Sequence, residues 1–99
     1  MDISQVLYRI KNEEIEIIQK EIPVQFDNKQ QCPLGFSWDK KHFEVLDLYR
    51  VIKDEGGNSN FLVMTTGGIY NLVLVRDSNE EVLSRSKWIL NFKIKDAVQ

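Results

Sequence analysis

Most of the chain after residue 20 consists of short runs in which apolar and polar residues alternate, separated by clusters of turn-forming residues. The clearest run lies near the C-terminus, where large apolar residues occupy every second position: Trp88, Leu90, Phe92 and Ile94. A period of two places successive side chains on opposite faces of a β-strand. The pattern predicts an antiparallel β-fold with Trp88 and Phe92 together on its buried face. Lys93 and Lys95 are then expected to face solvent.

Two hairpins are predicted from their turn residues. Gly67-Gly68 separates two β-rich runs, 61–66 and 69–76, and glycine permits the positive φ angles of a primed hairpin turn. The residues 39–41 (Asp-Lys-Lys) predict a tight reversal between two aromatic-rich segments. The sequence therefore places sharp, short connections between neighbouring strands.

Two further segments depart from simple alternation. Between residues 42 and 53 the apolar residues change phase, which predicts a bulge or bend near Asp47. The run from Ile22 to Phe26 predicts a short half-buried strand, in which Pro23 suits an edge because it cannot donate a ladder hydrogen bond.

The N-terminal segment, residues 3–20, is the only plausible long helix of the sequence. Four apolar residues share one helical face: Ile3, Val6, Leu7 and Ile10. Asp2 and Ser4 are the candidates for its N-terminal cap. From Glu14 to Ile17 the residues alternate instead, so a strand is the alternative beyond residue 13. We expect the helical stripe to pack on the domain's own sheet, because a short isolated helix is marginal in water.

With 99 residues and 11.6 kDa, the chain has room for one core, so residues 1–99 are expected to form a single domain. We expect residues 1–20 to form its helical segment and residues 21–95 its β-rich core. The predicted fold class is mainly β (α+β): a small antiparallel barrel, or a strongly bent sheet, of five to six strands with one N-terminal helix. Closure into a barrel would also remove exposed strand edges.

Charge and composition exclude several classes of protein. With a net charge of −2, the chain lacks the excess of basic residues that is typical of a nonspecific nucleic-acid or membrane-surface binder. The single cysteine, Cys32, excludes an intramolecular disulfide. No secretory signal or membrane span is apparent, so a cytoplasmic location without membrane contact is expected.

The order of three motifs resembles a family of small bacterial β-rich domains of unknown function. They are Pro33-x-x-Phe36-x-Trp38, then Gly67-Gly68-x-Tyr70-x-Leu72, and finally Trp88-x-Leu90. The resemblance implies a small β-domain and supplies no catalytic residue.

Candidate catalytic and metal-binding residues are isolated in the sequence. His42 is the only histidine, and Cys32 has no base or positive charge beside it, so pocket chemistry at either residue is kept only as an alternative to a noncatalytic domain. Acidic clusters at 13–16 and 80–81, and an oxygen-rich stretch at 77–81, are interpreted as solvated surface. The glycines at 56–57 and 67–68 lack the spacing of a phosphate loop. We therefore predict no catalytic, cofactor or metal site, and no cofactor.

The best functional signal is a basic stretch that contains aromatic residues. Four cations and no acid occur in it: Arg85, Lys87, Lys93 and Lys95. Small barrels bind single-stranded nucleic acid by combining such charges with aromatic platforms. The first hypothesis is nevertheless a noncatalytic protein-interaction or self-assembly module, since aromatic residues are frequent enough to leave interface anchors. A nucleic-acid-binding small barrel that uses the strand from Arg85 to Lys95 is the alternative.

Overall fold

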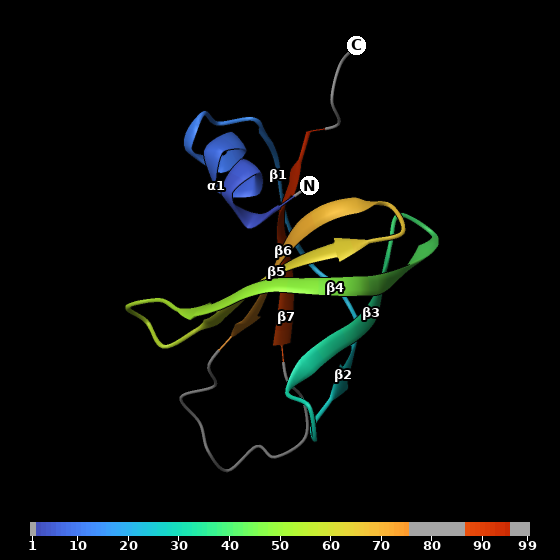
Figure 1. Cartoon of the computed structure of the whole chain (residues 1–99). Helices are drawn as coiled ribbons and strands as arrows, with labels where there is room; N and C mark the ends of the chain where they lie inside the picture. Colours follow the sequence, from blue (N-terminus) through green and yellow to red (C-terminus); the bar gives the residue numbers. More distant parts are fainter. Residues whose placement is uncertain (1, 76–86, 96–99) are drawn as a thin grey trace.

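The computed structural model describes residues 2–75 and 87–95, which form one helix and a seven-stranded antiparallel sheet (Figure 1). The elements in chain order are α1 (Ile3–Lys11), β1 (Ile15–Glu21), β2 (Val24–Asp27), β3 (Cys32–Trp38), β4 (Lys41–Lys53), β5 (Ser59–Thr65), β6 (Gly68–Val75) and β7 (Lys87–Ile94). The mainly β class with an N-terminal helix is confirmed. The number of strands is not five to six, because β1 is an additional strand. The helix α1 is too short to cross a membrane, and no other helix occurs in the described ranges.

Both ends of α1 are set by local hydrogen bonds. Asp2 is the N-terminal cap: its side chain accepts from the backbone N–H of Gln5 at 3.0 Å, and the Gln5 side chain accepts from Asp2 N–H in return. At the other end, Glu13 takes a left-handed φ of 59°. The N–H groups of Glu13 and Glu14 then donate back to the carbonyls of Ile10 and Arg9, the Schellman arrangement. The helix therefore stops at Lys11, and the strand alternative holds for residues 15–21.

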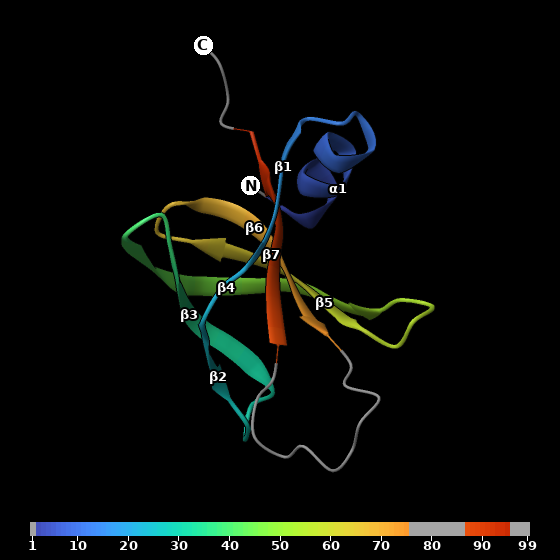
Figure 2. The ribbon, with the colours of Figure 1, turned by 180° about the vertical axis from the view of Figure 1, so that it is seen from behind.

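The sheet is a half-barrel whose two edges come from consecutive strands. Its order is β1-β7-β6-β5-β4-β3-β2, so β1 and β2 lie at opposite edges although only Ile22 and Pro23 join them (Figure 2). Ile22 N–H donates to the Trp88 carbonyl at 3.1 Å, and Ser37 N–H donates to the Pro23 carbonyl at 3.3 Å. These two bonds tie β7 and β3 together at one end of the curl. The predicted strand from Ile22 is thus divided: Pro23 precedes β2, and the strand starts at Val24.

Apolar side chains occupy both faces of the sheet. Inside the curl, the cluster joins Ile22 to residues of β3, β5, β6 and β7: Phe36, Phe61, Val63, Tyr70, Leu72, Trp88 and Leu90. The outer face carries a second cluster, in which Val6 of α1 is fully buried against Leu62, Ile69 and Ile94. The predicted helical stripe therefore packs on the domain's own sheet, as expected.

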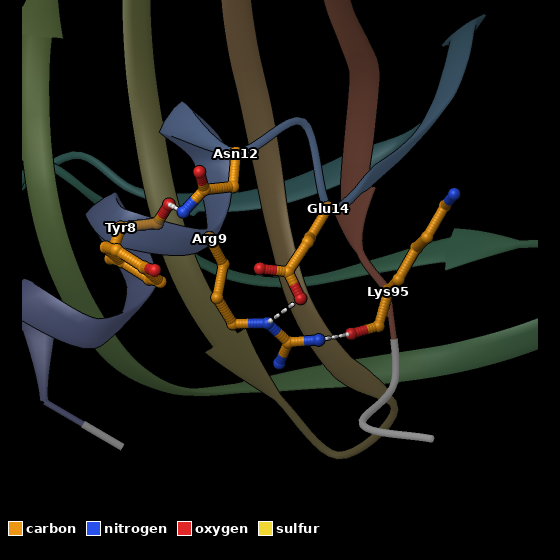
Figure 3. A network of polar contacts seen from close by, with 5 residues as sticks. All are labelled: Tyr8, Arg9, Asn12, Glu14 and Lys95. Atoms are coloured by element: carbon orange, nitrogen blue, oxygen red, sulfur yellow. Dashed lines mark hydrogen bonds and ion pairs between the residues drawn. The ribbon is translucent and has the colours of Figure 1, made fainter.

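Polar contacts fix the same helix to the ends of β1 and β7 (Figure 3). The guanidinium of Arg9 donates to the Lys95 carbonyl, and its Nε lies 3.6 Å from a Glu14 carboxylate oxygen. Asn12 Nδ2 donates to the Tyr8 carbonyl at 3.0 Å, and the same carbonyl also accepts the Asn12 backbone N–H at 3.1 Å. Arg9 therefore connects three segments: α1, the start of β1 and the end of β7.

The C-terminal strand changes face in its middle. Trp88 and Leu90 point into the curl, whereas Phe92 and Ile94 pack against α1 on the outer face. The register against β6 shifts between these pairs, so Asn91 is an extra residue in β7. The prediction that Trp88 and Phe92 share one buried face is therefore wrong, because a shift of one residue exchanges the faces.

Both predicted hairpin turns are present, but the predicted backbone angles at the Gly67-Gly68 turn are not. Thr65 pairs with Gly68, so the tight turn consists of Thr66 and Gly67, and neither of them has a positive φ. The primed turn predicted there is wrong. Positive angles at both central positions occur instead between β3 and β4, with φ of 52° at Asp39 and 62° at Lys40. The bulge predicted near Asp47 is confirmed by register shifts on both sides of that residue.

Candidate binding groove

An open groove of about 380 Å³ lies between β1 and the tip of the β3–β4 hairpin. Its position follows from the half-barrel: the two edges meet at Ile22 and Pro23, and the groove is bounded by residues at the other end of β1. The lining residues are Glu16, Ile18, Trp38, Asp39, Lys41, Phe43, Gly67, Tyr70 and Lys93. The site is thus assembled from segments that are distant in sequence.

The floor of the groove is aromatic. Phe43 stacks on Phe36 with ring centroids 5.1 Å apart, and Tyr70 contacts Phe43 at 5.5 Å. Phe36 and Tyr70 are buried, so this floor is fixed by the core. Trp38 is only half-buried at the end of β3, and its ring is part of the wall. The groove therefore presents π-surface on a rigid base.

The charges around the aromatic floor are balanced in sign. Glu16 and Lys93 are opposite each other in the β1–β7 ladder, and Lys93 Nζ lies 5.8 Å from the Tyr70 ring centroid. Asp39 and Lys41 supply the other pair, from the tip of the hairpin. Two carboxylates and two ammonium groups in one groove favour a ligand that is not a polyanion.

The predicted basic strand does not form one continuous surface. Arg85 lies outside the described residues, while Lys87 and Lys95 are exposed at the two ends of β7. Lys93 alone of the described three lines the groove. Trp88 is buried inside the curl, so it offers no stacking platform.

The isolated candidates stay isolated within the described part of the chain. His42 is exposed opposite Ser37, and the Cys32 thiol is half-buried beside Gln30. No group of three His, Cys, Asp or Glu side chains in residues 2–75 and 87–95 is arranged to hold a metal ion. Glu14 is engaged with Arg9. The acidic residues at 77–81 lie outside the described ranges.

Sequence reasoning missed the groove residues of the β3–β4 hairpin. Trp38 and Lys41 are opposite each other on either side of the turn, and Phe43 follows two residues later. The available signal was an aromatic residue at the end of its strand, directly before a charged turn, where only part of the side chain packs against the core. Alternation alone assigns such a residue to the core.

No family of known proteins, no curated protein and no solved structure matches the chain. The resemblance to small bacterial β-domains therefore stays a prediction.

Proposed function

We propose that this domain is a noncatalytic recognition module that binds an extended segment of a protein partner in the groove. The observation that carries the proposal is that half-buried Trp38 lines the groove together with Phe43 and the buried Tyr70. Aromatic residues that keep exposed surface next to a packed floor are the usual anchors of protein interfaces. Extended peptides fit such grooves because aromatic walls accept apolar side chains while flanking charges set the orientation.

The charge pattern favours a peptide over a nucleic acid. A phosphate backbone needs an excess of cations along its path, and binding then depends steeply on salt. Here Glu16 and Asp39 offset Lys41 and Lys93, and the whole chain carries a net charge of −2. A peptide has no charged backbone, so it avoids the repulsion that a polyanion would meet at Glu16 and Asp39. Nucleic-acid binding is kept as an alternative because Lys41 pairs with Trp38 in the β3–β4 ladder and both residues line the groove.

A random-peptide library displayed on phage tests the proposal with the intact chain. We expect enriched peptides to lose about tenfold or more in affinity for Trp38→Ala, because truncation of a central aromatic anchor removes most of its contact area. Leu34→Ala is the matched control: Leu34 is an exposed apolar residue of the same strand and does not line the groove. Enriched peptides that bind both variants equally, or a failure to enrich any peptide, would contradict the proposal.

A single-stranded oligothymidylate distinguishes the alternative. In fluorescence anisotropy at low salt, we expect Trp38→Ala to leave any binding of the oligonucleotide unchanged. Salt-sensitive binding lost in both Trp38→Ala and Lys41→Ala would instead support the nucleic-acid interpretation and overturn the peptide proposal.

A further inference from the structure

One wall of the groove is a strand with a free backbone edge. β1 is terminal in the sheet order and pairs only with β7 among the strands described for residues 2–75 and 87–95. Its ladder with β7 runs through the pairs Ile15–Ile94, Glu16–Lys93 and Ile17–Phe92. The other side of β1 therefore has no described strand beside it.

The hydrogen-bond pattern identifies which backbone groups point to that free side. Lys95 N–H donates to the Glu14 carbonyl at 3.0 Å, so Glu14 is a hydrogen-bonded position of the ladder. In an antiparallel pair such positions alternate with positions whose N–H and C=O point away from the partner strand. The backbone N–H and C=O groups of Glu16 thus point toward β7. Those of Ile15 and Ile17 point away from β7.

Along residues 15–17 this edge carries no lysine, proline or bulge, and its one charged side chain is that of Glu16. Edge strands are normally guarded by lysine, proline, a bulge or a covering element. In β1 the bulge occurs only after Ile17, where the register shifts and Gln19 takes a φ of 53°. Before it, Ile17 keeps 58% of its surface exposed, so an apolar side chain is open to solvent beside the free edge.

We propose that an extended segment of a partner protein adds to the free edge of β1 through the N–H and C=O groups of Ile15 and Ile17. This inference rests on the proposed peptide-binding function and names its binding mode. The added strand covers Ile17 on one face, and its alternate side chains enter the groove beside Glu16 and Ile18.

The side chains of β1 indicate which residue types the partner segment carries. A residue opposite Ile17 is apolar, since it covers an exposed aliphatic side chain. Its neighbour beside Glu16 is lysine or arginine, because opposite charges across a ladder stabilise and like charges destabilise. The partner is therefore an extended segment that alternates apolar and basic residues.

The same charges disfavour a second copy of this chain as the occupant. Antiparallel self-pairing must place outward positions opposite outward positions. If Ile15 faces Ile17 of the copy, the two Glu16 residues oppose each other; if Ile15 faces Ile15, Glu14 opposes Glu16. The remaining register brings Ile15 against Gln19, which lies in the bulge. Each register carries a repulsion or a broken ladder.

Amide hydrogen exchange tests the binding mode on the unmodified protein. The probe is a short synthetic peptide of alternating valine and lysine, and its control has glutamate in place of each lysine. We expect the lysine peptide to slow exchange at Ile15 and Ile17 by about tenfold or more and to leave Glu16, already bonded to β7, unchanged. The glutamate peptide should have a much smaller effect. No slowing at Ile15 and Ile17 with saturating lysine peptide would overturn the proposal.

A proline variant tests the same inference independently. Ile17→Pro removes only an outward N–H, whereas Ile17→Ala keeps it and removes the side chain. Binding lost in Ile17→Pro but retained in Ile17→Ala, with unchanged exchange at Glu16, is the expected result. Equal binding by both variants would contradict strand addition.

The failure of this inference is separable from the failure of the proposed function. If library peptides need Trp38 for binding and yet do not slow amide exchange at Ile15 and Ile17, groove binding would be supported. The same result would exclude strand addition. If the peptide still slows amide exchange at Ile15 and Ile17 in Trp38→Ala, strand addition would be supported, and the groove would be excluded as the anchor of the peptide. A dimer of the free protein that Ile17→Pro dissociates, measured by sedimentation, would identify a second copy as the occupant and overturn the basic-partner proposal.

Discussion

The ring of Phe43 lies against the Cα of Gly67, so that any side chain at Gly67 would overlap it. Phe43 is held in this place because it stacks on Phe36 and contacts Tyr70. The turn between β5 and β6 thus needs glycine at position 67 for space rather than for backbone conformation. This relationship also shapes the floor of the groove, to which both residues contribute.

Gly67→Ala should therefore destabilise the domain by about 1–3 kcal/mol, the usual cost of forcing atoms into a packed site. A double-mutant cycle by urea denaturation isolates the cause. In the Phe43→Ala background the same substitution should cost much less, since the overlapping ring is gone. Equal costs in both backgrounds would show that the Phe43 ring is not the reason for glycine.

The β-class of the fold could be predicted from alternation, but the faces of individual strands could not. Along β7 the alternation is unbroken from Trp88 to Ile94, yet the extra residue Asn91 moves Phe92 to the outer face. A bulge depends on what the neighbouring strands require, and nothing in the local pattern reveals it. The end of α1 was similarly hidden, because Glu13 rather than glycine takes the left-handed position.

The candidate groove was even less accessible to sequence reasoning. Its walls come from β1, the β3–β4 hairpin, β6 and β7, which only the curl of the sheet brings together. The helix stripe that contains Val6 was predictable, because all of its partners are simply apolar. A binding site depends on side chains left partly outside the core, such as Trp38, and periodicity does not distinguish these from buried ones.

Glu13→Gly should stabilise the domain by about 1 kcal/mol, because glycine adopts the left-handed conformation of the Schellman cap without the cost borne by other L-residues. Thermal melting measures the gain. Lys11→Gly is the control: it lies in the last turn of α1, and should lose about 1 kcal/mol instead. A loss of stability in Glu13→Gly would contradict the assigned cap.

Trp88→Ala should cost about 3–5 kcal/mol, because the ring is 97% buried and packs on Phe26 and Phe61 at centroid distances of 5.5 and 5.3 Å. Chemical denaturation of Trp38→Ala gives the comparison, since that ring is half-buried and its loss should be clearly smaller. Similar losses for the two variants would mean that Trp38 belongs to the core, and would weaken its role as a binding anchor.

Protonation of Asp54 at low pH should weaken the connection between β4 and β5. The backbone N–H of Asn58 donates to Asp54 Oδ1 at 3.0 Å and lowers the pKa of this carboxyl below its ordinary value of 3.8. A lowered pKa in the folded state means that the stabilisation is present above pH 3.8 and disappears as the pH falls through the folded-state pKa. A carboxyl titration followed by NMR should give a midpoint below 3.8, with the Asn58 amide shifting in parallel. A midpoint above 3.8 would contradict this hydrogen bond.

Removal of residues 1–12 should make the protein aggregate at every concentration, because it uncovers Leu62, Ile69 and Ile94 on the outer face of the sheet. Two point variants of α1 separate loss of docking from loss of the segment. Val6→Asp places a charge at a fully buried position and should reproduce the aggregation, whereas Tyr8→Asp changes a residue that is 66% exposed and should leave the melting temperature nearly unchanged. Sedimentation of all three proteins beside the wild type provides the measurement. A soluble, monomeric truncation with wild-type stability would show that the helix does not protect the sheet.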